Sequence, residues 1–310
     1  MARRRKGRPV NGWLILDKPA DMTSTQVVNI VRHIFDARKA GHAGTLDPLA
    51  TGILPIALGE ATKTINIAVD GTKGYRFTVQ WGAQTTTDDS EGEIVATRET
   101  RPTLGDVEAA LDAFVGNIEQ VPPKFSAIKV DGQRAYDLAR DGEAVELAAR
   151  QVTVHSLRVV DMPDADQTVL EAECGKGTYV RSIARDLGEA LGCLGHVTQL
   201  RRTVVGPFDE ASAVTLEALR QRERDETQLE VLQPVSAALG DLAELRMTND
   251  EIGRIRRGQP VILRGRDAPV RIDAAYATLK GELVALGAVA EGAFVPKRVF
   301  NLGSGGSEAG

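Results

Sequence analysis

Cysteine, histidine and aromatic residues are scarce in this chain of 310 residues, which holds two cysteines, four histidines and 4% aromatics. Cys174 and Cys193 lack the paired spacing of a zinc site or a disulfide framework, so we expect both to be small buried side chains in a reducing compartment. No apolar run approaches the roughly 18 residues that suggest a membrane span. The basic N-terminus is not followed by the apolar segment of a secretory signal. These absences favour a soluble, cytoplasmic protein.

Three common catalytic signatures are also missing. The GKGT segment at 175–178 lacks the residues that a phosphate-binding loop needs, since Leu170 and Gly177 stand where a Gly and a Ser or Thr are required. The histidines have no carboxylate-linked i, i+4 pairing, which argues against a catalytic metal. No Gly-x-Ser-x-Gly elbow occurs. We therefore expect no metal and no nucleotide cofactor.

Charge is unevenly distributed along the chain. The net charge is −5, yet residues 1–50 hold nine basic and four acidic side chains, so the remainder carries about −10. The acidic total argues against indiscriminate nucleic-acid binding, whereas the asymmetry permits one basic face on an acidic body. A solvated basic tail explains the same pattern, so both interpretations stay open.

Hydrophobic periodicity predicts an α+β fold with a mixed or antiparallel sheet. Alternating or continuous apolar runs predict strands at 12–16, 53–58, 75–81, 152–160, 168–174 and 196–205. Helical stripes predict a helix from Thr23 or Ser24 to Arg38 and Lys39, one from Thr103 to Gly116, and one from about Thr178. In the last helix, Tyr179 and Arg181 are expected beside the buried face rather than within it.

Composition divides the chain into five parts. We expect a basic tail at 1–9, a main domain at 10–235, a small β-rich unit at 240–300 and a flexible tail at 301–310. An insertion at about 122–150 carries a hairpin signal at Asp131-Gly132 and a short helical piece stopped at Gly142. It is either an ordinary meander or a mobile arm that closes on a ligand.

Asp47 is the residue that most suggests chemistry. It lies in GHAGTLDPLATG, residues 41–52, where glycines surround it and Pro48 fixes the backbone. A carboxylate held there without a metal can act as a base or as a nucleophile toward an electrophilic carbon such as the anomeric carbon of a sugar. Asp-Pro is also a common turn former. The local pattern therefore leaves glycosidic chemistry and a plain turn both open.

A longer stretch resembles a known family. Residues 41–63, GHAGTLDPLATGILPIALGEATK, closely resemble the signature loop of the bacterial tRNA pseudouridine synthase B (TruB) family, whose members isomerise uridine 55 in the T-arm of tRNA. Further segments match that family in order: 16–25, 73–89 and 175–188, with 122–140 resembling its thumb. The resemblance covers about 10–210 and continues more weakly into 240–300, which looks like a PUA-type RNA-binding module. It implies a cofactor-free isomerase with a largely antiparallel sheet flanked by helices, and tRNA as partner.

The resemblance also implies roles for three residues in the reaction. Asp47 matches the catalytic aspartate, which attacks the sugar or the base or abstracts a sugar proton while the C1′–N1 bond breaks. Arg181 matches the arginine paired with that carboxylate, and a charge-assisted pair of this kind stabilises the ionised acid. Tyr75 matches the tyrosine that stacks on the flipped base. Since a base stacked inside an RNA loop must be extruded first, an aromatic platform suits the task.

Three more positions match residues around the target nucleotide. His42 matches the histidine that fills the space left in the T-loop, while Tyr179 and Leu200 match residues lining the uridine pocket. The loop departs from many relatives at Ala43 and Thr45, which leaves Asp47 in place. Local positive patches for RNA are expected at the N-terminal segment, Lys63, Lys124, Lys129 and Arg134.

Two alternatives to the isomerase remain. A non-catalytic module could grip the T-arm and assist tRNA folding, and a glycosidase would release free uracil. We expect a monomer.

Overall fold

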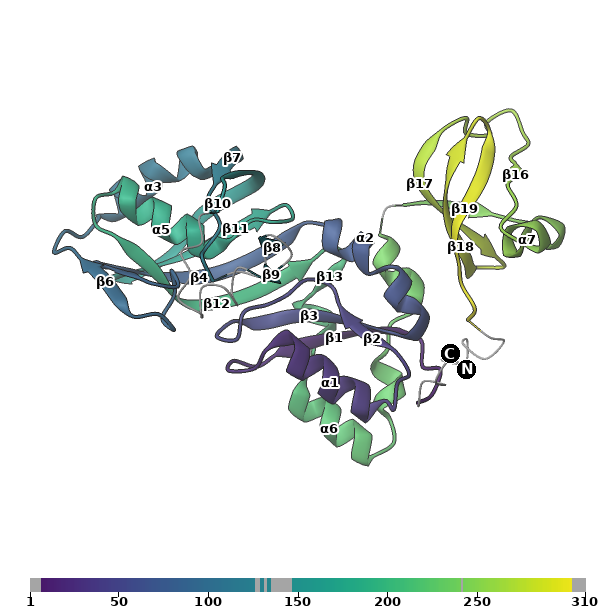
Figure 1. Cartoon of the computed structure of the whole chain (residues 1–310), viewed down its shortest axis with the longest axis horizontal. Coiled ribbons are helices and arrows are strands. Elements are labelled where there is room, and N and C mark those ends of the chain that lie inside the picture. The colour runs from purple at the N-terminus through teal and green to yellow at the C-terminus, as the bar shows by residue number, and fades with distance from the viewer. Residues whose placement is uncertain (1–6, 126–128, 131–132, 135–146, 241, 303–310) are drawn as a thin grey trace.

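A computed structural model describes residues 7–125, 129–130, 133–134, 147–240 and 242–302. Within these ranges the chain forms an α+β body around a ten-stranded mixed sheet, followed by a second sheet of five strands (Figure 1). The predicted fold class is confirmed. Two strand pairs of the large sheet are parallel, β1 with β14 and β3 with β12, and the others are antiparallel.

The large sheet has the strand order β14-β1-β3-β12-β4-β11-β10-β7, with β2 added beside β3 and β13 beside β12. Its strands are β1 (Gly12–Lys18), β2 (Ala40–His42), β3 (Thr51–Leu58), β4 (Lys73–Trp81), β7 (Gly116–Gln120), β10 (Arg150–Asp164), β11 (Gln167–Cys174), β12 (Gly195–Val205), β13 (Phe208–Asp209) and β14 (Val214–Thr215). Beside it, β5 (Ala83–Thr85) pairs with β6 (Ile94–Thr97). The central strands β3, β12 and β4 are adjacent although they are far apart in sequence.

Helices cover both ends of one face of this sheet. Figure 1 shows α3 (Leu104–Leu111) and α5 (Val180–Ala190) toward one end, and α1 (Ser24–Ile34) and α6 (Leu216–Arg224) toward the other. All four contribute to one apolar core cluster. On the opposite face, α2 (Ile65–Asp70) and the 3-10 helix η5 (Val235–Leu239) contribute to a second cluster.

Strand alternation explains why the sheet has two cores. Leu14 and Leu16 of β1 join the first cluster, whereas Trp13 and Ile15 join the second. Successive side chains of a strand point to opposite faces, so a strand that is apolar throughout is buried on both sides. The continuous apolar run at 12–16 is therefore the signature of a central strand.

The first helix ends earlier than its charge pattern predicts. It stops at Ile34, with Phe35 as the C-terminal cap, and Asp36 follows with a φ of 44°. This left-handed conformation turns the chain away from the helix axis. Arg38 and Lys39 therefore lie beyond the helix, and residues 40–42 form β2 instead of opening the loop. The predicted end of this helix was wrong.

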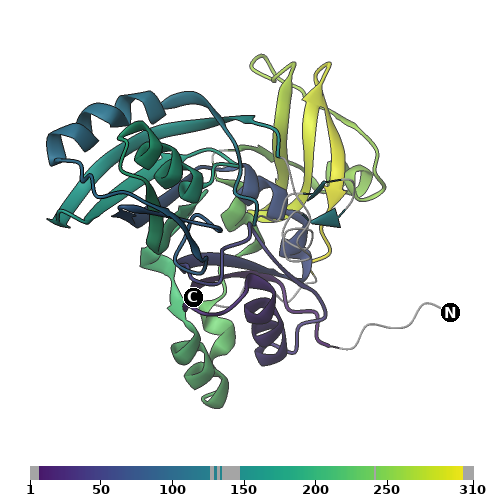
Figure 2. The ribbon, with the colours of Figure 1, turned by 60° about the vertical axis from the view of Figure 1, so that its left-hand side comes forward.

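The β-rich C-terminal unit contains β15 (Ala243–Arg246), β16 (Val261–Ile262), β17 (Ile272–Leu279), β18 (Glu282–Ala290) and β19 (Ala293–Val299). It also contains a helix the sequence did not suggest, α7 (Asn249–Arg256), which begins with a capping box formed by Thr248 and Glu251. The two sheets are separate layers in Figure 1, and Figure 2 shows the C-terminal sheet beside the main body.

The C-terminal unit is nevertheless packed against the main body. Leu283, Leu286 and Phe300 belong to the second apolar cluster, together with Trp13 and Ile53 of the large sheet. Just after β2 and β3, the 3-10 helix Gly59–Lys63 adds polar contacts: Lys63 Nζ donates to the Val299 carbonyl at 2.8 Å, and Asn301 N donates to Glu60 Oε2 at 2.7 Å. The charge of Lys63 is thus engaged between the two sheets.

The insertion is described only in part. β8 (Lys129–Val130) and β9 (Gln133–Arg134) pair antiparallel, as a hairpin requires. The Asp131-Gly132 turn, the helical piece before Gly142 and residues 1–6 lie outside the described residues. Cys174 and Cys193 are buried and unbridged, as expected. In the described part of the chain, no helix has the length and apolarity to cross a bilayer.

Candidate active site

The residues predicted for the site converge on the middle of the large sheet. Asp47 lies in the segment 43–50 between β2 and β3, and Tyr75 lies on β4. Leu200 lies on β12, the strand between β3 and β4. Arg181 lies in the first turn of α5, which packs against β12 and β4. Neighbouring strands and one helix thus bring four distant sequence segments together.

Asp47 and Arg181 form an ion pair. The Nε of Arg181 lies 3.0 Å from Oδ2 of Asp47, a contact of ion-pair distance that lacks the alignment of a hydrogen bond. The Asp47 side chain is 32% exposed, whereas that of Arg181 is only 4% exposed. The carboxylate is therefore accessible from solvent while its cation is buried beneath it. This arrangement suits an acid that must stay charged and still reach a substrate.

Burial of Arg181 departs from the expectation that it lies beside the buried face. Its other nitrogens explain how a guanidinium can be buried there: Nη1 donates to the Thr87 carbonyl at 2.9 Å and to Asp89 Oδ2 at 3.1 Å, and Nη2 donates to the Phe125 carbonyl at 3.0 Å. Hydrogen bonds to charged and polar partners offset desolvation of a buried cation. Arg181 therefore has a fixed position rather than a free surface conformation.

Asp89 is a site residue that the sequence analysis missed. Its side chain is 2% exposed, and it also accepts a hydrogen bond from the backbone N–H of Glu91 at 3.0 Å. The preceding Asp88 has a φ of 61° and pairs with Arg185 at 3.0 Å. Burial raises the pKa of Asp88, and Arg185 opposes that rise. From the sequence, two adjacent aspartates in a turn suggest a solvent-exposed polar loop. In the structure each of them pairs with a different arginine of α5.

The backbone beside Asp47 is held on both sides. On one side, Leu46 N donates to Ser24 Oγ at 2.9 Å, and that hydroxyl donates to the Leu46 carbonyl at 3.0 Å. On the other, Lys18 Nζ donates to the Pro48 carbonyl at 3.0 Å. The same ammonium also donates to the carbonyls of Pro19 and Met22, at 2.7 and 2.8 Å.

Lys18 is fully buried, another feature the sequence did not reveal. Burial lowers the pKa of Lys18 to about 8, and the nearby Asp47 carboxylate opposes that fall. The three carbonyl oxygens around Nζ match the three donors of an ammonium ion. The charge on Lys18 therefore both supports the loop and contributes a positive field at Asp47.

Tyr75 and Leu200 provide an apolar boundary. Leu200 is 6% exposed within the first core cluster, and Tyr75 is half-buried and packs against that cluster. Burial raises the pKa of Tyr75, while the Arg202 guanidinium acts in the opposite direction. The neutral phenol thus lies between the core and the charged loop. Its predicted contact with a flipped base remains a prediction.

His42 and Tyr179 lie at the starts of the two segments that carry the ion pair. His42 ends β2, opposite Ile56 of β3, and its pKa is lowered by burial and by Arg202. A neutral imidazole is therefore expected there. Tyr179 is the N-terminal cap residue of α5, and its backbone N–H donates to Gln120 Oε1 at 2.8 Å. The predicted substrate contacts of both residues remain predictions.

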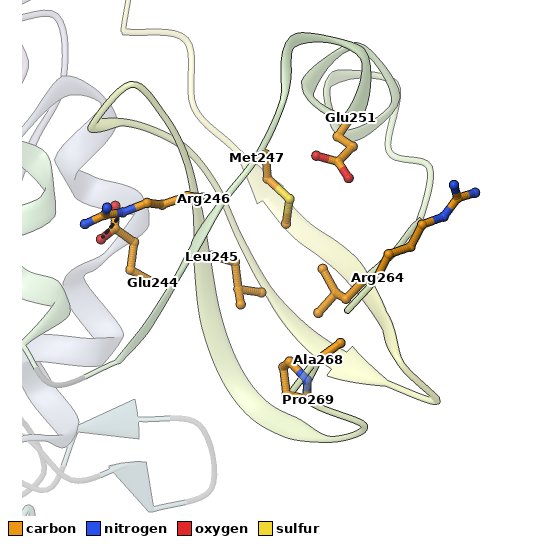
Figure 3. Close-up of a pocket in the computed structure, with 9 residues that line it drawn as sticks. Glu244, Leu245, Arg246, Met247, Glu251, Arg264, Ala268 and Pro269 are labelled. Carbon is orange, nitrogen blue, oxygen red and sulfur yellow. Dashed lines mark ion pairs between the residues drawn. The ribbon is translucent and has the colours of Figure 1, made fainter. Parts of the chain in front are cut away.

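A hollow elsewhere in the molecule is separate from these residues. It measures about 500 Å³ and lies in the C-terminal unit, lined by Leu245, Met247, Leu263 and Pro269 with charged residues around them (Figure 3). Within the described ranges, no group of three or more His, Cys, Asp or Glu side chains is arranged to hold a metal ion.

Comparison with known proteins identifies the family. The model of the TruB family pseudouridylate synthase N-terminal domain matches residues 32–180, and that of the tRNA pseudouridylate synthase B C-terminal domain matches residues 181–240. A protein of Ruegeria sp. (strain TM1040), named tRNA pseudouridine synthase B, is 56% identical over 301 residues, which cover 97% of this chain and 99% of the relative.

The chain belongs to the TruB family.

Other relatives agree with this membership. A Brucella anthropi protein of the same name is 52% identical over 324 residues, covering 98% of this chain and 100% of its own. A chain in the crystal structure of a Cbf5-Nop10-Gar1 complex superposes with a TM-score of 0.72 at 26% identity, covering 94% of this chain and 85% of that one. The resemblance stated from the motifs is confirmed, and with it the expectation of a pseudouridine synthase. Within this TruB family member, the Asp47 loop lies inside the matched N-terminal domain.

Proposed function

We propose that this chain converts uridine to pseudouridine in tRNA, at position 55 of the T-loop, and does so as a monomer. The observation that carries the proposal is the Asp47–Arg181 ion pair, in which an accessible carboxylate sits over a buried guanidinium. Relatives named tRNA pseudouridine synthase B, at 52–56% identity over nearly the whole chain, support tRNA as the substrate.

The reaction exchanges one bond between sugar and base for another. The C1′–N1 bond breaks, the uracil turns, and a C1′–C5 bond forms, after which the hydrogen on C5 is lost to solvent and N1 carries a proton. An ionised Asp47 serves either route to bond breaking, as a nucleophile or as the base that removes a sugar proton. Arg181 holds that carboxylate in place. It also stabilises the negative charge of the carboxylate when the carboxylate is regenerated at the end of either route.

The target base must leave its stack before Asp47 can reach it. Tyr75 offers a half-buried ring on which an extruded uracil can stack, and Leu200 lies in the core cluster behind it. We propose that Tyr179 completes the pocket and that His42, next to the loop, fills the space vacated in the RNA. These assignments follow the predicted roles of the six residues.

We propose a second RNA contact on the C-terminal unit, residues 240–300. This stretch holds ten basic and eight acidic residues, in contrast to the acidic chain as a whole. At the hollow in Figure 3, Arg264 extends its guanidinium outward, whereas Arg246 is paired with Glu244 at 3.5 Å. Lys124, at the start of the insertion, is exposed and can add to a positive surface. The side chains of Lys129 and Arg134 lie outside the described residues.

The test is an assay of the purified chain on an unmodified tRNA transcript tritiated at uracil C5. We expect release of tritium to water with an unchanged RNA mass, because isomerisation replaces the C5 hydrogen and removes no atom from the backbone. Free uracil in solution would instead indicate a glycosidase. Tight binding without tritium release would indicate a folding or binding module.

The Asp47→Asn variant separates chemistry from binding. It is nearly isosteric but cannot act as a nucleophile or base, so tritium release should vanish while tRNA affinity stays close to that of the unchanged chain. Equal loss of binding and turnover would show that Asp47 only supports the fold.

A further inference from the structure

Arg202 is a buried cation that the proposed reaction has not yet used. It lies on β12 and is 2% exposed. Its neighbour Arg201 on the same strand has carboxylate partners, Asp17 at 2.9 Å and Glu210 at 2.5 Å. Among the residues that the structure describes, no carboxylate forms an ion pair with Arg202. A buried guanidinium without a counter-charge is costly, so a specific benefit is needed to explain it.

The guanidinium of Arg202 donates to three main-chain oxygens around Asp47 and also interacts with the Tyr75 hydroxyl. Nη2 donates to the Gly44 carbonyl and Nη1 to the Thr45 carbonyl, each at 3.2 Å, and Nε donates to the Ile53 carbonyl at 2.8 Å. Gly44 and Thr45 precede Asp47, whereas Ile53 follows it at the start of β3. One rigid planar group therefore spans both ends of the segment that carries the carboxylate.

The close approach of the two strands is visible at Gly52. This residue pairs with Arg202 across β3 and β12, and a side chain there would meet the Arg202 carbonyl oxygen at 2.2 Å. Arg202 also stands opposite Tyr75 in the register of β12 and β4. Its position thus relates the Asp47 segment to the strand that carries the aromatic ring.

At the entry to the loop the Ala43 N–H also donates to the Pro55 carbonyl of β3 at 2.9 Å, and the other side-chain supports act at single residues. Ser24 holds Leu46, and Lys18 holds Pro48. Neither of these supports fixes the entry to the loop or its connection to β3. The three hydrogen bonds of Arg202 hold the entry to the loop and also its connection to β3. They come from β12, which lies between β3 and the Tyr75 strand β4.

We propose that Arg202 is a positioning residue for Asp47, whose guanidinium ties both ends of the catalytic loop to the strand facing Tyr75. It acts through the backbone and contacts no reacting atom. The inference rests on the proposed function, since its effect is measured on the isomerisation. Without these hydrogen bonds the protein should still fold and bind tRNA, but the Asp47 carboxylate should be misplaced.

The test compares Arg202→Lys with Arg201→Lys under single-turnover conditions at saturating enzyme. A lysine keeps the charge, but its three donors share one terminal nitrogen. It therefore has no donor where Arg202 Nε meets the Ile53 carbonyl while its ammonium reaches Gly44 or Thr45. We expect Arg202→Lys to lower the rate of tritium release by about 100-fold, the scale on which small misplacements of reacting groups act. The Kd for tRNA should change by less than about threefold, because a misplaced carboxylate costs rate and not uniform binding. Arg201→Lys, which can keep its ion pair, should behave like the unchanged chain.

Hydrogen exchange supplies a readout independent of turnover. In Arg202→Lys, amides of residues 43–50 should exchange faster while those of β10 and β11 stay protected. If the variant does not fold, Arg202→Met, which leaves no buried charge, is measured in the same way. Unchanged turnover in the folded variant, or parallel losses of melting temperature and tRNA affinity, would overturn the inference. Failure of the unchanged chain to release tritium would instead refute the proposed function.

Discussion

Asp47 and Asp89 hold one guanidinium from two positions: Oδ2 of Asp47 lies 3.0 Å from Nε of Arg181, and Oδ2 of Asp89 lies 3.1 Å from its Nη1. The first carboxylate is 32% exposed and the second only 2%. The two acids therefore have different tasks, because the accessible one can meet a substrate and the buried one can only hold the arginine.

Replacing Asp89 with Asn should lower kcat by about 10- to 100-fold with little change in KM, since Arg181 loses the charge that fixes it beneath Asp47. The matched control is Asp88→Asn, which removes the neighbouring carboxylate from Arg185 and tolerates the same positive φ. Tritium-release kinetics on both variants provide the measurement. Similar losses in the two would assign the effect to the turn as a whole.

Activity and stability should respond to alkaline pH in opposite directions through Lys18. Burial lowers its pKa to about 8 from 10.5, so between these values the unfolded chain binds more protons and this group's contribution to stability rises with pH. A neutral amine has two donors for three carbonyls, so the Pro48 side of the loop loosens and kcat should fall as pH rises through about 8.

The measurement is kcat and melting temperature across this pH range, with Lys18→Met as the comparison. That variant cannot titrate, so its lower kcat should lack the alkaline decline attributed to Lys18. A decline of the same size in Lys18→Met would assign the titration to another group.

Gly52→Ala should destabilise the protein more than Gly116→Ala. Both glycines have nearly the same φ, 97° and 99°, so both alanines incur the cost of a left-handed backbone, about 1–2 kcal/mol. At Gly116 an added Cβ meets nothing within 4 Å, whereas at Gly52 it meets the Arg202 carbonyl oxygen at 2.2 Å. Chemical denaturation should show the larger loss for Gly52→Ala, together with reduced kcat. Equal losses would mean that β3 and β12 separate at no cost.

Phe300→Ala should weaken the attachment of the C-terminal unit. Phe300 is 5% exposed in the second core cluster and lies 5.7 Å from Lys63 Nζ. Truncating a buried phenylalanine costs about 3–5 kcal/mol. Thermal unfolding should report this loss, and tRNA affinity should fall more than kcat at saturation. The control is Val295→Ala, because Val295 is 39% exposed and its truncation should matter little. A loss of kcat equal to that of affinity would place Phe300 in the support of the Asp47 site instead.

Local patterns in the sequence were sufficient for the elements but not for the supports of the site. Tyr75, Phe77, Val79 and Trp81 alternate along a strand that the structure confirms as β4, because period-two burial is a property of the strand alone. The capping box at Thr103 is equally local. The end of α1 was missed because the cations at 38 and 39 suggested a longer helix, whereas Asp36 adopts a positive φ and residues 40–42 pair with β3.

The missed site residues depend on distant partners. Asp89 and Arg181 are 92 positions apart, and Gly44 and Arg202 are 158 apart. One signal was present for Arg202: it shares strand parity with Leu200, so an arginine occupied a position pointing toward the core. A charged side chain at such a position needs buried hydrogen-bond partners. Only the folded structure shows that these are the carbonyls of Gly44, Thr45 and Ile53.

The apolar contact between the two sheets limits how modular this enzyme can be. Leu283, Leu286 and Phe300 complete a cluster that includes Ile53, whose carbonyl is one of the three bound by Arg202. A C-terminal unit taken from another protein would have to match the apolar surface around Trp13 and Ile53, since otherwise that surface would be exposed to solvent. Recombination at residue 240 should therefore yield working chimeras only between parents whose side chains at this contact correspond in size and shape.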